Sequence, residues 1–205
     1  MKIALFGATG RVGRSVLDKA LASGHTVTVL VRTPEKLPVH DRLTVIQGDA
    51  RDEQAIYQTI SGMNVVFSAL GTDKTTTLTE SVPHMIQSMK TVGITRIVTI
   101  GTAGILESRI EPGKLRYEST ESHRKLTFAA EEHHRVYDLL NESKLDWTIV
   151  CPTYLPDGDE QGNYRVERDY LPENGKQISV GDTGAFAFDE LLACKHVCYR
   201  VGIAY

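Results

Sequence analysis

The sequence has few cysteines and no long hydrophobic run. Cys151, Cys194 and Cys198 are the three cysteines among 205 residues, and an odd number without a secretion signal argues against a disulfide framework. His196 lies between Cys194 and Cys198, but zinc usually needs four ligands and no second ligand pair is present, so no metal site is expected. No apolar run is long enough for a signal-peptide core or a membrane span. We therefore expect a cytoplasmic protein without a membrane segment.

Blocks of like charge are also missing. The 23 lysine and arginine residues stand against 26 aspartate and glutamate residues, which gives a formal net charge of −3. Without a basic block, nucleic-acid binding is not indicated. No linker, low-complexity segment or repeat interrupts the chain, so one domain over residues 1–205 is expected. The sequence leaves the oligomeric state open.

Apolar runs alternate with helical patterns along the chain. Strands are expected at "KIALFGA", "TVTVLVR", "LTVIQGD", "NVVFSALG", "RIVTIGTAG" and "DWTIVCP", and helices near residues 11–23, 52–60, 79–92, 126–142 and 182–193. These strands are apolar on both faces, which is typical of a parallel sheet covered by helices. The alternation predicts an α/β fold with a doubly wound parallel sheet of the Rossmann type.

Two helix starts carry further expectations. Asp182 is expected to cap the last helix. Pro83 is expected to kink its helix if the helix starts near Thr79, or to occupy the first turn if it starts at Val82. Two segments, 103–125 and 153–181, follow strand ends without a regular pattern. Because ligands of doubly wound sheets bind beyond the carboxyl ends of the strands, these segments are expected to form the substrate side.

A glycine-rich turn follows the first strand in "FGATGRVG". Gly7, Gly10 and Gly13 are spaced three apart between a strand and a helix. That context predicts a dinucleotide site: a tight turn, close approach of the backbone to a pyrophosphate, and a helix N-terminus that faces the phosphates. Thr9 and Arg11 add a hydroxyl and a positive charge.

The second and third strand ends bear on the choice of cofactor. Arg32 stands where NAD-preferring sites usually carry an acidic residue, and a guanidinium suits a 2′-phosphate, so NADP is favoured over NAD. Lys36 is expected to assist, whereas Glu35 would oppose a phosphate if it pointed inward. Asp49 is a candidate acceptor for the adenine amino group, with Ala50 beside the ring; alternatively Asp49 caps the next helix, a role that Asp52 also fits.

Together, "FGATGRVG", "VLVR", "GDARD" and "SALGT" resemble the atypical short-chain dehydrogenase/reductases, most of all the flavin reductase and biliverdin-IXβ reductase group and its NmrA-like relatives. The resemblance covers most of the chain, though residues 103–125 match poorly. It implies that NADP is bound by Gly7, Thr9, Gly10, Arg11, Val12, Gly13, Arg32, Asp49, Ala50, Leu70, Gly71, Thr102, Pro152 and Thr153. It also implies reduction of a flat conjugated acceptor such as a flavin, a quinone or a linear tetrapyrrole.

The catalytic tyrosine–lysine pair of most short-chain dehydrogenases is not found. In that pair the lysine follows the tyrosine by four residues, and none of the tyrosines checked has a lysine at that spacing. Transfer of hydride to an electron-poor ring needs positioning more than an acid–base pair. Thr102 and His133 are the candidates for a catalytic role. Alternatively, Thr102 satisfies backbone groups at the strand end and His133 packs the long helix or holds the nicotinamide end.

Two further expectations concern side chains of the predicted helix 126–142 and of the segment 103–125. His133 and Tyr137 are expected to face the sheet, together with Leu126, whereas His134 is expected to be solvated. Arg109, Arg116, Arg124 and Lys125 are either solvated or placed to meet an anionic acceptor. The sequence therefore predicts an NADPH-dependent reductase of a flat conjugated small molecule; the alternative is an NmrA-like redox sensor that binds NADP without turning it over.

Overall fold

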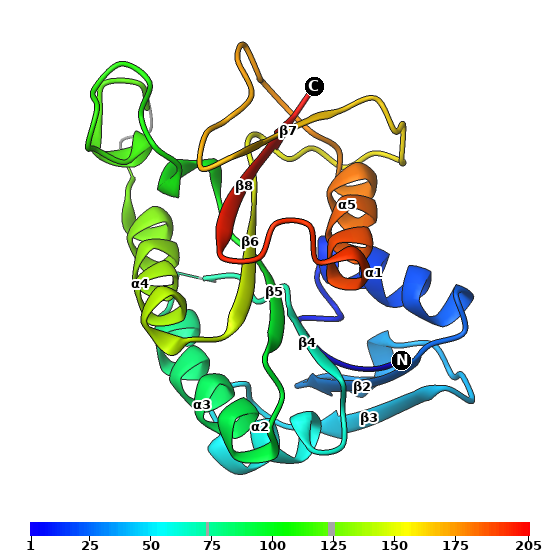
Figure 1. Ribbon diagram of the computed structural model, residues 1–205. Coiled ribbons are helices and arrows are strands. Elements are labelled where there is room, and N and C mark those ends of the chain that lie inside the picture. Colours follow the sequence, from blue (N-terminus) through cyan, green and yellow to red (C-terminus); the bar gives the residue numbers. More distant parts are fainter. Residues whose placement is uncertain (73, 123–125) are drawn as a thin grey trace.

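The computed structural model describes residues 1–72, 74–122 and 126–205 of the chain (Figure 1). Within these residues one sheet holds its strands in the order β3-β2-β1-β4-β5-β6-β8-β7. The strands are β1 (Lys2–Phe6), β2 (Thr26–Val31), β3 (Leu43–Gln47), β4 (Val65–Ser68), β5 (Arg96–Ile100), β6 (Asp146–Pro152), β7 (Arg165–Arg168) and β8 (Tyr199–Ala204). All neighbouring strands are parallel except β7, which is antiparallel to β8.

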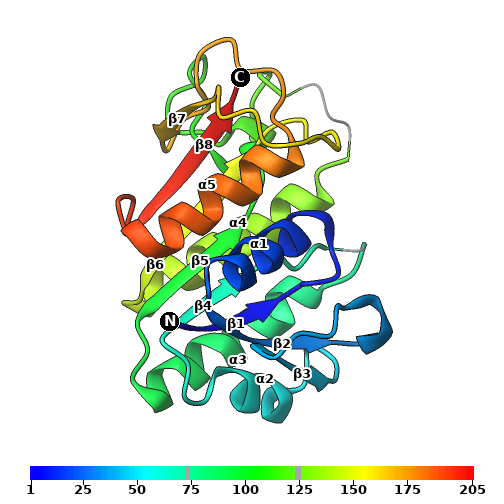
Figure 2. The same ribbon diagram turned by 90° about the vertical axis from the view of Figure 1, so that its right-hand side faces the viewer.

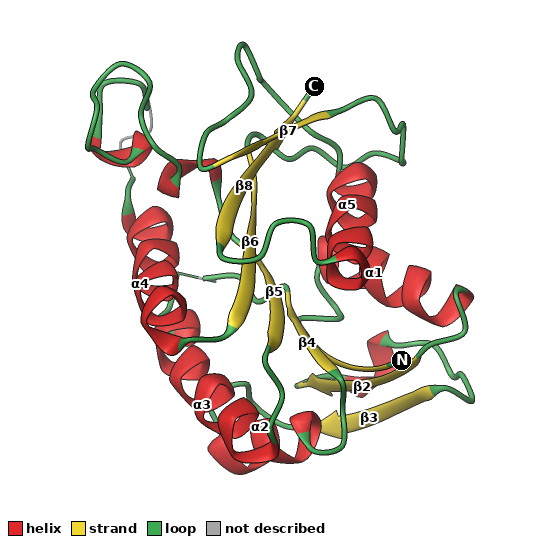
Figure 3. Cartoon of the chain, viewed as in Figure 1, coloured by secondary structure: helices red, strands yellow, loops and turns green. Residues whose placement is uncertain are grey.

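Helices cover both faces of the sheet (Figure 3). They are α1 (Arg11–Ala22), α2 (Glu53–Ile60), α3 (Thr77–Val92), α4 (Phe128–Ser143) and α5 (Val180–Ala193), with short 3₁₀ turns η1 (Pro34–Lys36), η2 (Ala103–Ile105) and η3 (Arg116–Glu118). One face carries α1 and α5, which lie in front of the sheet in Figure 2, and the other carries α2, α3 and α4. The predicted doubly wound α/β fold is confirmed.

Each layer has its own apolar core, as the two-faced strands require. Phe6 packs with Ile56 and Met85 under α2 and α3, whereas Leu5 packs with Val16 under α1 and α5. Successive side chains of β1 thus enter opposite cores, which is the alternation expected of a strand. The edge strand β3 is the exception among the predicted strands, because most of its residues are exposed.

The last part of the sheet was missing from the sequence prediction. The six predicted strands are present, but β7 and β8 were not predicted. β8 adds to β6 in parallel, although its run carries the buried Arg200. That guanidinium donates to the carbonyl of Ile105 at 2.6 Å and pairs with Glu107 and Asp169. These partners compensate the buried charge of Arg200. Because they are distant in sequence, the residues next to Arg200 do not reveal that β8 tolerates a charged side chain.

Several predicted helix starts were wrong. Ser179, not Asp182, caps α5: its hydroxyl accepts a hydrogen bond from the Asp182 backbone N–H at 3.0 Å. The Asp182 carboxylate instead accepts from the backbone of Gln161 and Gly162, and so ties the 153–181 segment to α5. The long helix begins only at Phe128, so Leu126 lies before it and is 88% exposed.

Pro83 lies inside its helix, as expected for the earlier of the two predicted starts. α3 begins at Thr77, two residues before Thr79, and Pro83 has an exposed position within it. A proline there removes one helical hydrogen bond and crowds the carbonyl four residues before it.

Candidate functional site

The turn after β1 is shaped by glycines that nothing larger can replace. Gly7 has φ of +81°, and a Cβ there would lie 2.5 Å from the carbonyl oxygen of Ala69. A Cβ on Gly13 would lie 2.1 Å from the Gly7 carbonyl oxygen, so α1 packs directly on the turn. Gly10 caps α1 without a side-chain acceptor. The free N–H groups of the first helical turn therefore suit an anion.

This turn opens into a cleft of about 610 Å³, which we call the main cleft. Its lining comes from the carboxyl ends of parallel strands and from the starts of helices: Gly7, Thr9, Gly10, Arg11, Val12, Leu30, Val31, Arg32, Gly48, Asp49, Ala50, Arg51, Ala69, Leu70, Gly71, Thr72, Thr75, Thr77, Ile100, Gly101, His133 and Leu155. The volume falls within the range of small-molecule and cofactor sites.

Three arginines line the main cleft and give it a positive character. Arg32 follows β2. Arg51 follows β3, where its Nε and Nη2 donate to the two Asp49 oxygens at 3.0 and 2.8 Å. These hydrogen bonds lower the pKa of Asp49 to about 2. Arg11, at the start of α1, donates to the Leu155 carbonyl at 2.9 Å and to Asp157 at 3.0 Å, and so joins the glycine turn to the 153–181 segment.

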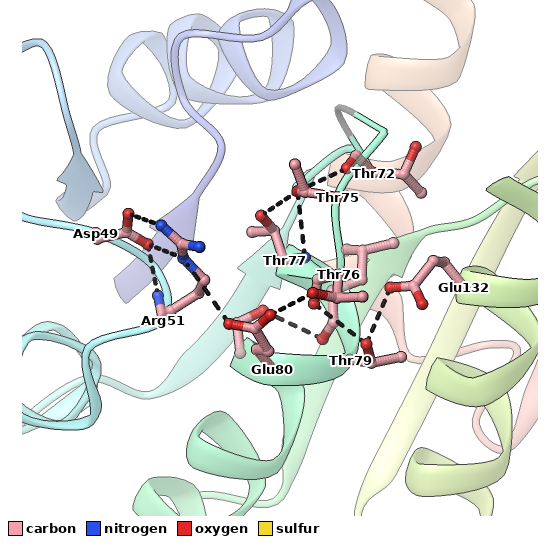
Figure 4. Close-up of polar contacts among 11 residues, drawn as sticks. Asp49, Arg51, Thr72, Thr75, Thr76, Thr77, Thr79, Glu80 and Glu132 are labelled. Atoms are coloured by element: carbon pink, nitrogen blue, oxygen red, sulfur yellow. Dashed lines mark hydrogen bonds and ion pairs between the residues drawn. The ribbon is translucent and has the colours of Figure 1, made fainter. Parts of the chain in front are cut away.

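A chain of polar contacts leads from Arg51, which lines the main cleft, to helices α3 and α4 (Figure 4). Arg51 lies 4.0 Å from Glu80 on α3, and Glu80 accepts a hydrogen bond from Thr76. Thr79 then donates to the fully buried Glu132 of α4 at 3.0 Å. The chain fixes α3 and α4 relative to the β3 end. Asp52, not Asp49, caps α2, since its carboxylate accepts from two backbone N–H groups of the first turn.

His133 lies at the other end of the main cleft, beside Ile100 and Gly101. Desolvation by the surrounding protein lowers the pKa of His133 to about 4. The imidazole is therefore neutral at pH 7, which does not fit a proton donor at neutral pH and fits the alternative of packing beside a bound ring. Thr102 accepts a hydrogen bond from the Gly104 N–H at 3.4 Å, so its hydroxyl oxygen serves the backbone of η2.

A second pocket, of about 110 Å³, adjoins the main cleft beyond the end of β5. It is lined by Thr102, Ala103, Gly104, Arg116, Tyr117, Ser122, Leu126, Thr127, Ala129, Ala130 and Thr153. Thr102 directly follows Gly101 of the main cleft, and Ala130 precedes His133 by one helical turn. Both predicted substrate-side segments contribute to it. Arg116 is paired with Glu121, and Arg124 and Lys125 lie outside the described residues.

The predicted site residues divide between these cavities. Gly7, Thr9, Gly10, Arg11, Val12, Arg32, Asp49, Ala50, Leu70, Gly71 and His133 line the main cleft. Thr102 and Thr153 line the second pocket instead. Gly13, Lys36 and Pro152 line neither: Gly13 packs against the turn, Pro152 is buried at the end of β6, and Lys36 lies in η1, where its carbonyl accepts from Arg14.

Several lining residues were missed by the sequence analysis. Arg51 stands two residues after Asp49 in "GDARD", and its charge at a strand end was the available signal. Thr72, Thr75 and Thr77 follow β4 in a hydroxyl-rich run that was also a usable signal. The solvated position expected for His134 was wrong, because its ring is half-buried and contacts the Tyr117 hydroxyl at 2.9 Å.

The geometry defines a Rossmann-type dinucleotide site. The glycine cradle excludes side chains where a pyrophosphate must approach, and one cleft runs from the β2 and β3 ends to the β5 end, so the residues present fit NAD or NADP. A family model described as NAD(P)H-binding matches residues 7–193. The chain belongs to this family, and the predicted resemblance at family level is confirmed.

Two curated relatives match over nearly the whole chain. The uncharacterized protein YwnB of Bacillus subtilis is 28% identical over 205 residues, covering 96% of this chain and 94% of the relative. The reductase pytE of Aspergillus terreus is 26% identical over 242 residues, covering 93% of this chain and 91% of the relative. One of these two relatives is thus named a reductase.

Solved structures share the fold. A Bacteroides thetaiotaomicron protein provisionally named an epimerase is 30% identical with a TM-score of 0.85, covering 100% of this chain and 96% of that one. A provisionally named NADH-flavin reductase of Streptococcus pneumoniae is 24% identical with a TM-score of 0.84, covering 100% and 99%. A Veillonella parvula short-chain dehydrogenase/reductase in complex with NADP is 21% identical with a TM-score of 0.80, covering 100% and 94%.

Two further properties of the described residues concern membrane-spanning helices and metal-binding groups. No helix there is long and apolar enough to cross a membrane. In the same part of the chain, no group of three or more histidine, cysteine, aspartate or glutamate side chains is arranged to hold a metal ion.

Proposed function

We propose that the protein is an NADPH-dependent reductase that transfers hydride to a flat conjugated small molecule such as a flavin, a quinone or a linear tetrapyrrole. The observation that carries the proposal is that the two cavities have neighbouring walls. Gly101 of the main cleft is followed directly by Thr102 of the second pocket, and His133 of the main cleft lies one helical turn after Ala130 of the second pocket. A dinucleotide and an acceptor therefore have adjoining places at the carboxyl edge of the sheet.

NADPH, when bound, supplies the hydride; the protein supplies position and charge. The α1 N-terminus and Arg11 meet the pyrophosphate, and Arg32 meets the 2′-phosphate at the end of β2. Asp49 and Ala50 flank the adenine. The neutral His133 packs at the nicotinamide end without placing a positive charge beside a ring that becomes cationic on oxidation. These roles rest on where the side chains lie along the main cleft.

The names of similar proteins support a redox role. One curated relative is called a reductase, and one protein of the same fold is provisionally called an NADH-flavin reductase. The NADP complex of another protein with this fold accords with NADP as the cofactor. A third similar protein is provisionally named an epimerase, which indicates a different reaction. An epimerase would show no net consumption of NADPH.

The test is NADPH oxidation followed at 340 nm with FMN, 1,4-naphthoquinone and biliverdin in separate reactions, and with NADH as the control donor. We expect loss of absorbance with at least one acceptor, and faster with NADPH than with NADH. Tight NADPH binding without turnover of any acceptor would contradict the reductase and favour the redox sensor. No binding of either nucleotide would contradict both.

A further inference from the structure

A tyrosine and a histidine from different segments meet at the second pocket. Tyr117 belongs to η3 in the 103–125 segment, and His134 belongs to α4. The Tyr117 Oη lies 2.9 Å from His134 Nδ1, and the two rings meet edge to face with centroids 5.8 Å apart. In Figure 1 the segment that carries η3 lies beyond the N-terminal end of α4, where it faces the carboxyl edge of the sheet.

Asp138, a more exposed side chain, extends the contact between Tyr117 and His134 toward solvent. His134 Nε2 lies 3.7 Å from the Asp138 carboxylate one helical turn further along α4, and that carboxylate is 58% exposed. Tyr117, His134 and Asp138 therefore form a line from the second pocket to the surface. A histidine between a phenol and a carboxylate is suited to passing a proton, because its two ring nitrogens bond on opposite sides.

Local packing holds Tyr117 in place. The backbone N–H of Leu115 donates to Glu118 Oε2 at 3.0 Å, and the N–H of Arg116 donates to the Leu106 carbonyl at 2.8 Å. A Cβ on Gly104 would lie 3.4 Å from the Cβ of Tyr117, so η2 and η3 are in close contact. The phenol is thus fixed at the pocket wall before any ligand binds, which favours catalysis by positioning.

Charges around the phenol keep it protonated. Burial and the nearby carboxylates of Glu118, Glu131 and Asp138 raise the pKa of Tyr117. Glu118 Oε1 also lies 3.3 Å from the hydroxyl. Arg116, a cation among the described residues that line the pocket, is paired with Glu121. The phenol is therefore neutral at pH 7 and retains a proton to donate, and the contact of its oxygen with His134 Nδ1 at 2.9 Å, rather than its acidity, favours a proton-transfer role.

We infer that Tyr117 is the proton donor to the acceptor in the second pocket, and that His134 is the positioning residue that orients and reprotonates it. The inference rests on the proposed reductase. The acceptor is reduced by the two electrons and hydrogen of the NADPH hydride, and NADPH is oxidised to NADP⁺. The O–H bond of Tyr117 breaks as an O–H or N–H bond forms on the acceptor. As the Nδ1–H proton of His134 passes to the phenolate, a proton from solvent bonds to Nε2 beside Asp138, and exchange of the ring protons with solvent restores the Nδ1–H form for the next turnover.

The size of the second pocket fits this step. A cavity of about 150 Å³ holds benzene in another protein, so the pocket of about 110 Å³ is too small for a whole ring and admits one edge of a flat acceptor. The carbonyl or ring nitrogen at that edge is the atom that needs a proton once hydride has been added. The rest of the acceptor then lies toward the main cleft.

The kinetic test compares Tyr117→Phe and His134→Gln with wild type, using NADPH and whichever of FMN, 1,4-naphthoquinone and biliverdin wild type reduces fastest. A positioned general acid contributes on the order of 10²-fold or more, so Tyr117→Phe should lower kcat about 100-fold with an unchanged NADPH Kd. His134→Gln should lower kcat about 10-fold while leaving both the NADPH Kd and the KM for the acceptor unchanged. Tyr154→Phe is the matched control, because Tyr154 lines neither cavity, and it should behave as wild type.

A second readout needs neither nucleotide nor acceptor. In ¹H–¹⁵N spectra of the histidine rings of the free protein, Tyr117→Phe should move the Nδ1 resonance of His134, whereas Tyr154→Phe should not. Full activity of Tyr117→Phe, or an unmoved His134 resonance, would overturn the inference and leave the reductase standing. Absence of turnover in wild type would overturn the reductase and this inference together.

Discussion

The buried His133 makes a quantitative prediction about acid stability. Desolvation lowers its pKa from 6.5 to about 4 in the folded protein. Above pH 6.5 the imidazole is neutral in both the folded and the unfolded chain and does not affect stability. As the pH falls from 6.5 to 4, the unfolded chain binds a proton that the folded chain does not bind, so the free energy of unfolding decreases. Below pH 4 the full loss remains.

The size of the loss follows from the pKa difference. Each pKa unit corresponds to about 1.4 kcal/mol, so a shift from 6.5 to about 4 gives a full loss of roughly 3 kcal/mol, most of which is reached at pH 4.5. That is a large part of the 5–15 kcal/mol by which most domains are stable. His133→Gln removes the titrating group and should remove this part of the pH dependence.

The assay is urea unfolding of wild type and His133→Gln at pH 7.0, 5.5 and 4.5. Other groups titrate alike in both proteins, so the difference between them isolates His133. As an internal control, wild type and His133→Gln are compared at pH 7.0 and 8.0, where the His133 imidazole is neutral in both states and the difference between the two proteins should not change with pH. Equal losses in wild type and His133→Gln between pH 7.0 and 4.5 would refute the reasoning.

Two further predictions concern backbone geometry. Gly13→Ala places a Cβ 2.1 Å from the Gly7 carbonyl oxygen, so it should cost about 1–3 kcal/mol of stability and weaken NADPH binding in a calorimetric titration. Gly10→Ala, with its Cβ at 3.3 Å from the same oxygen, should do less, and the reverse order would count against the packing described. Pro83→Ala should restore a helical hydrogen bond in α3 and raise stability by about 1–3 kcal/mol, seen as a higher Tm; a lower Tm would show that the proline fits its helix.

The features of the site that the sequence predicted depend on residues that are close together in the sequence. Gly7 and Gly13 act through the strand–turn–helix that contains them, and Arg32 is placed by the end of its own strand. The pattern of apolar runs was likewise sufficient for the sheet as far as β6. These features depend on contacts between near neighbours in sequence, which a single sequence reveals.

The parts that it missed depend on tertiary contacts. Tyr117 and His134 meet because η3 folds back onto α4, and no spacing rule predicts that contact. Arg200 is a charged residue inside β8 that becomes acceptable only when Glu107 and Asp169, distant in sequence, surround it. His133 was correctly expected to face inward, but its neutrality follows from burial that only the folded structure shows.

The central claim is that the main cleft binds NADPH with its 2′-phosphate at Arg32, and calorimetric titration of NADPH and NADH tests it most directly. A charge-assisted hydrogen bond contributes about 1.5–3 kcal/mol, so Arg32→Ala should weaken NADPH binding about 10- to 100-fold and leave NADH binding nearly unchanged. Lys90→Ala, which removes a charge at the C-terminal end of α3, outside the cleft lining, should match wild type. Equal affinity of wild type for both nucleotides, or unchanged NADPH affinity in Arg32→Ala, would contradict the account.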